Sequence, residues 1–369
     1  MKAYNLDNIF LSKKAMMNVV LLLNRYRVNK DVNFRNKFED ELAKYLNVKH
    51  VFACTNGTNG LHIAMLALEV KTGDEIITHP LYNIATISSI LKCGARPVLA
   101  KIKEDGAMDV DDVEKKINSN TRGIIAAHIR GSNENLAALQ KLKKKHGLFI
   151  VEDACQALGS EIRIRNEWKK IGTIGDIGVF SFALQKLITT IEGGLIVTNN
   201  NKLAFRINAF VGQGNYESEN FILGFNSRMD HLHAAIGLGN LESINFLISE
   251  RKKRWLKYYD SLKDYTWLRI LKPDEDQVTN YMSLIMSVAC EKIRPRLTKL
   301  LLSKGHVVGF YTKGDELDRK FVNRSVDHEL KECVLNFEKD KIELPTHHEV
   351  SESDINNIIK CFKCVNDNL

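Results

Sequence analysis

Residues 177–198 read IGVFSFALQKLITTIEGGLIVT. Two short apolar runs, 179–182 and 194–198, enclose a segment whose single cation is Lys186. Apolar runs of this length, bounded by glycine or small polar residues, are typical of buried strands. The stretch therefore predicts two strands of a buried sheet, with a lone lysine close to the end of the first strand.

The same pattern recurs on the N-terminal side of this stretch. Helical periodicity, for example at 61–68, 85–91 and 134–146, alternates with short apolar runs at 51–53, 75–78, 97–102, 123–129 and 148–151. Strands that alternate with helices predict an α/β fold with a largely parallel or mixed sheet. In such sheets the ligand chemistry collects at the carboxyl ends of the strands.

The pattern changes near residue 232. We expect one long helix at 232–259, a strand at 283–288, a helix at 293–304 and a last helix at 353–362 with Ser351 or Ser353 as its N-cap. The chain has 369 residues, whereas single cores stop growing near ~250–300 residues. We therefore expect a large domain with an N-terminal segment over 1–240 and a small α+β domain over 241–369.

Composition excludes several classes of protein. Hydrophobic residues make up 44% of the chain and charged residues 27%, which are ordinary fractions for a globular protein. The net charge of +8 comes without a recognition motif, so we expect no nucleic-acid partner. The apolar stretch 16–23 is shorter than the ~20 residues of a membrane span, so we expect no membrane association. Seven scattered cysteines, with a lone CxxC at 361–364, predict a reduced, cytoplasmic protein without a metal site.

Four elements near predicted strand ends carry the candidate chemistry. Residues 56–60 read NGTNG and are either a plain turn or a phosphate site built from glycines and free N–H groups. Asp153 follows an apolar run and is either a helix cap or the partner of a cationic ring nitrogen. Lys186 is either solvated or a desolvated amine that forms a Schiff base with a carbonyl. Residues 226–229 are either a helix cap or a further polar binding loop.

A phosphate-binding turn, an acid, a lysine and a polar loop, in this order, are the parts of a pyridoxal phosphate site. The phosphate must be bound, the ring nitrogen needs a carboxylate to stay protonated, and the aldehyde needs an amine that holds it as an imine. The protonated ring withdraws electrons when the Cα–H bond of a substrate breaks, and the lysine moves that proton.

These residues resemble the sugar aminotransferases of the DegT/DnrJ/EryC1/StrS family, which share the type I aminotransferase fold. The matching motifs are Asn56-Gly57-Thr58, Gly94–Val98, His128–Gly131, Glu152–Gly159, Gly175-Asp176, Phe180–Phe182 with Lys186 and Glu192–Gly194, and Gly224–Met229. The resemblance implies a large domain with a mixed, mostly parallel seven-stranded sheet flanked by helices, and a smaller C-terminal α+β domain.

The resemblance also implies roles for single residues. It implies that Lys186 forms the imine with the cofactor and is the acid and base of the reaction. It implies that Asp153 pairs with the ring nitrogen and that Gln156 reaches the ring hydroxyl.

Phosphate contacts are implied as well. Within one subunit they come from Gly57, Thr58 and Ser181, and the match of Asn226 implies a contact from the neighbouring subunit. The protein would then be a homodimer with shared active sites. Arg228 is a further candidate contact to a phosphate or to the carboxylate of the amino donor.

Two departures from the family pattern concern the substrate side. Asn83 stands where the family often places an aromatic ring over the cofactor, and Tyr82 is the alternative stacking residue. The C-terminal part lacks the family's usual His-Tyr-x-Pro-x-His segment, which often helps to shape the substrate pocket.

The function implied by the resemblance is transfer of an amino group from glutamate or glutamine to a keto-sugar in amino-sugar biosynthesis. The resemblance favours a keto-sugar that is linked to a nucleotide. Two alternatives remain open. One is a sugar dehydratase that uses the same cofactor on the same fold, in which the lysine is commonly replaced by histidine. The other is a non-catalytic homologue, against which the presence of both Lys186 and Asp153 argues.

Overall fold

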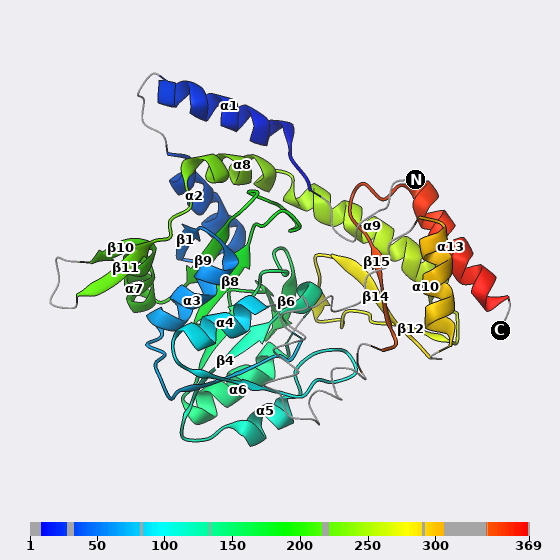
Figure 1. Cartoon of the computed structure of the whole chain (residues 1–369), viewed down its shortest axis with the longest axis horizontal. Coiled ribbons are helices and arrows are strands. Elements are labelled where there is room, and N and C mark those ends of the chain that lie inside the picture. Colours follow the sequence, from blue (N-terminus) through cyan, green and yellow to red (C-terminus); the bar gives the residue numbers. More distant parts are fainter. Residues whose placement is uncertain are drawn as a thin grey trace.

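The computed structural model describes residues 9–27, 33–81, 84–132, 134–215, 221–289, 292–305, 337 and 339–367. Figure 1 shows a large sheet flanked by helices on one side of the molecule and a smaller sheet with its own helices on the other. A long helix, α9 (Ile244–Leu262), runs from the first part to the second. We call these two parts the seven-stranded unit and the three-stranded unit.

Seven strands form the main sheet in the order β1-β9-β8-β5-β4-β2-β3. They are β1 His50–Cys54, β2 Glu75–Thr78, β3 Arg96–Leu99, β4 Thr121–Ala127, β5 Phe149–Asp153, β8 Ile177–Ser181 and β9 Gly194–Thr198. Neighbours from β8 to β3 pair in parallel, and β9 is antiparallel to both β8 and β1. The predicted α/β fold with a mostly parallel sheet of seven strands is therefore confirmed.

Helices cover both faces of this sheet. They are α1 Lys13–Arg27, α2 Phe34–Leu46, α3 Gly57–Ala67, α4 Ile84–Lys92, α5 Val110–Lys116, α6 Leu136–His146, α7 Asn201–Val211 and α8 His231–Leu241. Side chains of α3, α4 and α7 share one buried cluster with the strands, whereas α2 and α8 contribute to a second cluster and α5 and α6 to a third.

The period of the strands explains this division. In β4, Ile124 and Ala126 belong to the cluster under α5 and α6, whereas Ile125 between them belongs to the cluster under α3 and α7. In β8, Val179 and Phe180 divide in the same way between opposite faces. Since successive side chains of a strand point to opposite faces, continuous apolar runs predict a sheet buried on both sides.

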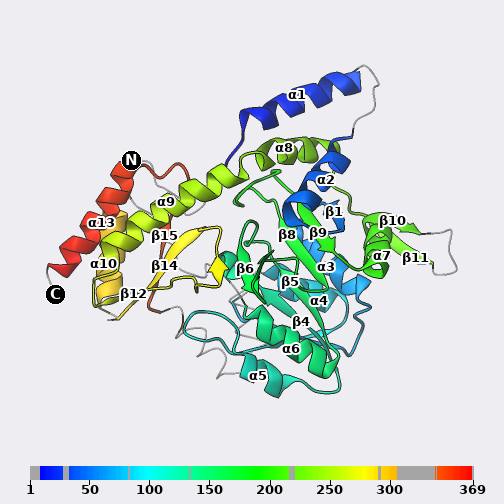
Figure 2. The ribbon, with the colours of Figure 1, turned by 180° about the vertical axis from the view of Figure 1, so that it is seen from behind.

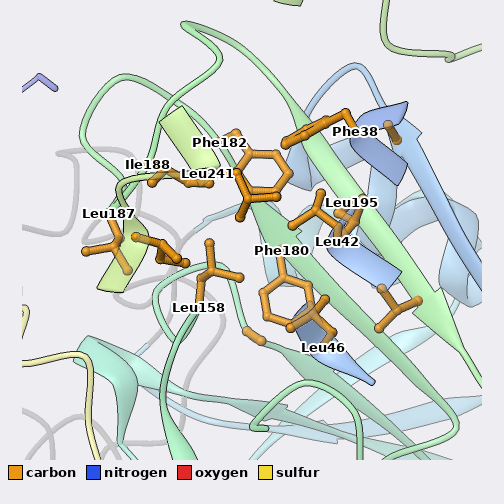
Figure 3. Packing of buried hydrophobic residues seen from close by; sticks show 14 of the residues in the cluster. Phe38, Leu42, Leu46, Leu158, Phe180, Phe182, Leu187, Ile188, Leu195 and Leu241 are labelled. Atoms are coloured by element: carbon orange, nitrogen blue, oxygen red, sulfur yellow. The ribbon is translucent and has the colours of Figure 1, made fainter. Parts of the chain in front are cut away.

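The core beneath α2 and α8 fixes the strand that leads into the candidate site. Figure 3 shows Phe38, Leu42 and Leu46 of α2 packed beside Phe180 and Phe182, which belong to β8 and the residues after it. The rings of Phe38 and Phe182 lie 5.3 Å apart. Burial of a side chain of this size contributes about 1.5–3 kcal/mol, so the end of β8 is held firmly in place.

The prediction of one continuous helix at 232–259 is wrong. The chain forms α8 and α9, with a break at Glu242 and Ser243. Ser243 leaves helical geometry at φ −96° and ψ 1° and occupies the N-cap position of α9, where serine is favoured. The break lets α8 pack on α1 and α2 while α9 continues to the three-stranded unit, as Figures 1 and 2 show from opposite sides.

The three-stranded unit has its own core. Its strands follow the order β12-β14-β15, and its helices are α9, α10 and α13. The bounds of the elements not yet given are β12 Leu268–Ile270, β14 Ser283–Val288, β15 Lys341–Pro345, α10 Ile293–Ser303 and α13 Glu352–Asn366. Ser351 is the N-cap of α13 and forms a capping box with Asp354. Of the two N-cap candidates, Ser351 is therefore the correct one.

Two small sheets complete the fold. The strands β6 (Glu161–Ile164) and β7 (Glu167–Lys170) form a hairpin after β5, and β13 (Gln277–Val278) pairs with β6. The other sheet is a hairpin of β10 (Gly212–Asn215) and β11 (Ile222–Asn226). Within the described residues, no helix has both the length and the apolar character needed to cross a membrane.

Candidate active site

A cavity of about 430 Å³ opens at the carboxyl edge of the main sheet. It lies where β4, β5 and β8 end, at Ala127, Asp153 and Ser181, and where α3 begins, at Gly57. This is the edge at which ligands bind in open α/β sheets. Among the described residues, its lining is Asn56, Gly57, Thr58, Leu61, Ala85, Ala127, His128, Ile129, Asp153, Cys155, Gln156, Ser181, Ala183, Leu184, Gln185, Lys186 and Glu192.

The turn from β1 into α3 forms one wall of the cavity. Asn56 is the N-cap of α3, and its side-chain oxygen accepts a hydrogen bond from Asn59 N at 2.8 Å. Gly60 N donates to Asn56 O at 3.0 Å, so the N–H groups of Gly57 and Thr58 precede the first intrahelical hydrogen bond. N–H groups at the positive end of the helix dipole favour a bound anion.

Gly57 makes a close approach that another residue would block. A Cβ at this position would lie 2.9 Å from Cys155 Sγ and 3.2 Å from Ser181 Cβ. The missing side chain therefore lets the start of α3 approach Ser181 closely, and both line the same cavity. An anion bound in the cavity could contact both the helix start and Ser181, whereas the plain-turn interpretation gives this close approach no role.

Asp153 lines the cavity with both carboxylate oxygens hydrogen-bonded. Its Oδ2 accepts a hydrogen bond from the buried Thr86 Oγ1 at 2.8 Å, and its Oδ1 accepts one from Cys155 N at 3.3 Å. No helix starts directly after β5, because residues 155–159 form turns. The helix-cap interpretation of Asp153 is therefore wrong, and its carboxylate is held in one orientation at the end of the strand.

Behind this carboxylate lies a buried ion pair between His128 and Glu152. His128 Nε2 lies 3.1 Å from Glu152 Oε2, and His128 Nδ1 lies 2.9 Å from Ser132 O. Both ring nitrogens thus face acceptors, which is the arrangement of a protonated imidazole. Burial alone would lower the pKa of His128, but the hydrogen bond and negative charge of Glu152 raise it above its ordinary value.

Glu152 is held on its other side by the backbone. Its carboxylate accepts hydrogen bonds from Gly172 N, Ile174 N and Gly175 N. Burial would raise the pKa of Glu152, yet the hydrogen bonds from His128 and from these backbone groups lower it. The pair is therefore ionised, and it fixes the strand end beside Asp153.

Gln156 reaches the cavity from the turn after β5. Its Oε1 accepts a hydrogen bond from Arg130 N at 2.8 Å, and its backbone oxygen accepts one from Asn280 Nδ2 at 2.8 Å. Asn280 belongs to the segment that leads into the three-stranded unit. The two units therefore both contribute to the position of this side chain.

Lys186 lies on the segment that joins β8 to β9. Its backbone N–H donates to Ala183 O at 3.0 Å, and its half-buried side chain lines the cavity. The neighbouring Cys155 thiol is buried, which raises its pKa well above the ordinary value; the charge of Asp153 raises it further, whereas that of Lys186 lowers it. A thiol in this state is protonated and unreactive, so Cys155 is not a candidate nucleophile of the cavity.

The structure brings six of the predicted residues to one cavity. They are Gly57, Thr58, Asp153, Gln156, Ser181 and Lys186. Asn226 and Arg228 lie apart, with exposed side chains, at and just after the end of β11. Arg228 is also held in a backbone bridge to Cys54, the last residue of β1. Tyr82 and Asn83 lie outside the described residues.

Sequence reasoning missed the residues that support the predicted ones. His128 occurs in a motif that matches the family and Thr86 lies three residues after Asn83, but nothing in the sequence indicates that Thr86 binds Asp153 or that His128 binds Glu152. Glu192 also lines the cavity, directly before the glycine pair at 193–194. Glu192 could have been proposed from the sequence, because it lies within a motif that matches the family and just before a predicted strand.

Comparison with known proteins gives the same assignment over most of the chain. The model of the DegT/DnrJ/EryC1/StrS aminotransferase family matches residues 12–363. GDP-perosamine synthase of Vibrio cholerae is 37% identical over 201 residues, which are 53% of this chain and 54% of that protein. The match thus spans about half the length of that relative.

Two further relatives extend the similarity. The UDP-4-amino-4,6-dideoxy-N-acetyl-beta-L-altrosamine transaminase of Helicobacter pylori is 32% identical over 257 residues, 68% of each chain. The structure of Helicobacter pylori PseC, described as an aminotransferase involved in the biosynthesis of pseudoaminic acid, superposes with a TM-score of 0.86, 26% identity and full coverage of both chains. This chain belongs to the DegT/DnrJ/EryC1/StrS aminotransferase family.

Proposed function

We propose that the protein is a pyridoxal-phosphate-dependent aminotransferase that moves an amino group from glutamate or glutamine to a nucleotide-linked keto-sugar. The observation that carries this proposal is the meeting of Lys186, Asp153 and the anion-binding wall of Gly57, Thr58 and Ser181 in one cavity. An amine, a fixed carboxylate and an anion site are the three contacts that this cofactor requires.

The residues present fit the cofactor. Its phosphate would bind in the cavity at the start of α3, which the missing Cβ of Gly57 allows to lie close to Ser181. Its ring nitrogen would face Asp153, whose two oxygens are already oriented by Thr86 and the backbone. Its ring hydroxyl would face the Gln156 amide.

The protein side of the reaction then follows from these positions. When bound, pyridoxal phosphate supplies an aldehyde and an electron-withdrawing ring. Lys186 Nζ takes the proton from Cα of the amino donor and returns a proton at the carbon of the acceptor that receives nitrogen. The Asp153 carboxylate keeps a proton at the ring nitrogen, because Thr86 prevents it from turning away. The ionised pair behind it holds β5 and the His128 turn in place.

The nature of the acceptor rests on the relatives. Their names specify a GDP-linked amino sugar in one case and a UDP-linked amino sugar in another. The net charge of +8 is favourable for attraction of a diphosphate-bearing substrate. Both points support a nucleotide-linked keto-sugar and an amino-sugar product.

A homodimer with shared active sites is part of the proposal. Helix α1 exposes Met16, Met17 and Val20, with 55%, 66% and 60% of their surface in solvent, and Phe221 and Leu223 are exposed just before and within β11. Apolar groups exposed in this number mark an interaction surface. Burial of β11 against a second copy would bring Asn226 to a neighbouring phosphate and Arg228 to a phosphate or a donor carboxylate.

The domain boundary and the location belong to the same proposal. We assign cofactor binding to residues 1–240 and a supporting role to 241–369; residues 1–8 and 306–336 in these ranges are outside the described part. The two separate buried clusters support this division. The cysteines of the described part are all free thiols, which supports a cytoplasmic protein.

The test is transfer of labelled nitrogen. The loaded protein is incubated with amine-15N glutamate, or with amine-15N or amide-15N glutamine, and with GDP- and UDP-linked 4-keto-6-deoxysugars, and the products are analysed by mass spectrometry. We expect a nucleotide-linked amino sugar that carries the amine label. Loss of water from the sugar without nitrogen would instead identify a dehydratase, and no reaction with any pair would favour the non-catalytic homologue. Lys186→Ala is the matched control.

A further inference from the structure

The orientation of the Gln156 amide is determined by its neighbour. Arg130 N lies 2.8 Å from Gln156 Oε1, and a backbone N–H only donates hydrogen bonds, so the atom that faces it is the amide oxygen. The NH2 end of the same amide is therefore the part that remains for a ligand in the cavity. Gln156 can therefore donate a hydrogen bond to a ligand atom, because its contact with Arg130 N fixes which end of the amide faces the cavity.

The backbone of Arg130, which directs this N–H at Gln156, adopts an unusual conformation. Its φ and ψ are 54° and 26°, in the left-handed region, which favours glycine because other residues place Cβ too close to a carbonyl oxygen. Such a conformation persists where the surroundings determine it from several sides. The following residue, Gly131, also has a positive φ of 79°.

The surroundings that hold Arg130 belong to the three-stranded unit. Its Nη2 donates a hydrogen bond to Glu343 Oε2 at 3.1 Å, and its Nε lies at ion-pair distance, 2.7 Å, from Glu343 Oε1. Glu343 is fully buried in β15, between Ile342 and Leu344 of that unit's core. Nη1 also lies 3.8 Å from Met282 Sδ.

We propose that Arg130 is a positioning residue: its ion pair with Glu343 holds the left-handed backbone that fixes Gln156 as a hydrogen-bond donor to the cofactor. The inference rests on the proposed function, since the cofactor is the ligand that the amide meets. The described part of the three-stranded unit does not line the cavity. Through the contact between Glu343 and Arg130, this unit nevertheless fixes the orientation of the Gln156 amide in the site.

The consequence for the cofactor has a definite sign. The amide NH2 donates to the ring oxygen, which is more negative when the chromophore formed with Lys186 has lost its proton. The donor therefore favours the deprotonated chromophore and lowers the pH at which the visible band changes. Loss of a hydrogen bond to a charged oxygen should raise that midpoint by about one to two pH units.

Two substitutions at Arg130 separate positioning from simple stability. Arg130→Ala and Arg130→Gly both remove the ion pair and leave Glu343 buried without its guanidinium partner, so both should be made with Glu343→Gln as well. Glycine adopts the left-handed backbone readily and keeps the N–H in place, whereas alanine does not. Arg130→Lys keeps a cation beside Glu343 and serves as the conservative variant.

The first readout needs no cofactor. Residue-resolved hydrogen exchange is measured on the cofactor-free protein at the amide of residue 130. Protection should persist in the wild-type, Gly and Lys proteins and be lost in the Ala variant and in Gln156→Leu. Equal protection in the Ala and wild-type proteins would overturn the proposal.

The second readout is the pH midpoint of the visible band of the loaded protein. We expect the pH midpoint to shift upward in the Ala variant by the same amount as in Gln156→Leu. Combining these two changes should give no larger shift than either alone. In the Gly and Lys variants the midpoint should stay near that of the wild type. Equal shifts in the Gly and Ala variants, or no shift in either, would overturn the proposal. A wild-type protein without a visible band would instead contradict the proposed function, and the exchange experiment would still decide the role of Arg130.

Discussion

Substitution of Gly57 by alanine tests the anion-binding wall quantitatively. The new Cβ would lie 2.9 Å from Cys155 Sγ and 3.2 Å from Ser181 Cβ, so the start of α3 or these neighbours must shift where we place the phosphate contacts. If it displaces the phosphate from one N–H group of α3, the loss is one hydrogen bond to a charged group, about 1.5–3 kcal/mol. The dissociation constant of pyridoxal phosphate should then rise about 10- to 150-fold.

The same substitution should change the stability of the cofactor-free protein by about 0–2 kcal/mol, because two effects oppose each other. Overpacking costs about 1–3 kcal/mol, and alanine is favoured over glycine in a helix by about 0.8–1 kcal/mol. The additional change Cys155→Ala removes the nearest clashing atom and should restore stability, while affinity stays low because the Cβ remains beside Ser181. Affinity is measured by fluorescence titration and stability by thermal unfolding.

Gly60, in the same turn of α3, offers a matched control. A Cβ there would lie 2.8 Å from Val179 Cγ1, inside the core and away from the cavity. Gly60→Ala should therefore destabilise the protein and leave the affinity for the cofactor within about twofold of the wild-type value. If Gly57→Ala also binds the cofactor within about twofold, the phosphate does not bind at the start of α3, and the reasoning fails.

Four further substitutions test other parts of the site. Lys186→Ala should lower turnover by at least about 10²- to 10⁴-fold while the phosphate contacts still bind the cofactor; near-normal turnover would remove its assigned role. Asp153→Asn should slow the reaction by about 10²- to 10³-fold, measured by single-turnover absorbance, and an unchanged rate would show that the carboxylate does not act on the ring. Asn226→Ala should weaken cofactor retention in a protein that sediments as a dimer, and an active wild-type monomer would contradict the shared site. His128→Gln tests the buried pair. Because the pKa of His128 is raised, the contribution of the pair to stability is fully present below about pH 6.5 and is lost as the pH rises through the raised pKa. The loss in Tm should therefore be larger near pH 6 than near pH 9.5, and an equal loss at both would refute an ionised pair with Glu152.

The sheet was predictable because its strands are buried on both faces. Continuous apolar runs at 148–151 and 194–198 mark β5 and β9, because runs this short that follow a glycine favour a buried strand over a buried helix. The hairpin of β6 and β7 was not predicted, since Arg163 and Lys169 make it a charged, partly exposed element without an apolar run. Its strands form through pairing with each other and with β13, which lies more than a hundred residues further along the chain.

The candidate site divides in a similar way. Residues in a local motif, such as Asp153 and Lys186, could be proposed from their position after a strand. Thr86 could not be placed beside Asp153, because 67 residues separate them and only the folded sheet brings them together. The contact between Arg130 and Glu343 spans 213 residues and joins two units, so no local pattern indicates it.

The central claim is that Lys186 is the amine that holds the cofactor in this cavity. The direct measurement is reduction of the loaded protein with sodium borohydride, followed by proteolysis and mass spectrometry of the peptides. We predict a single phosphopyridoxyl-modified peptide, with the modification on Lys186, and none in the Lys186→Ala protein. Modification of a different lysine, or a protein that binds the cofactor without any reducible linkage, would contradict the account.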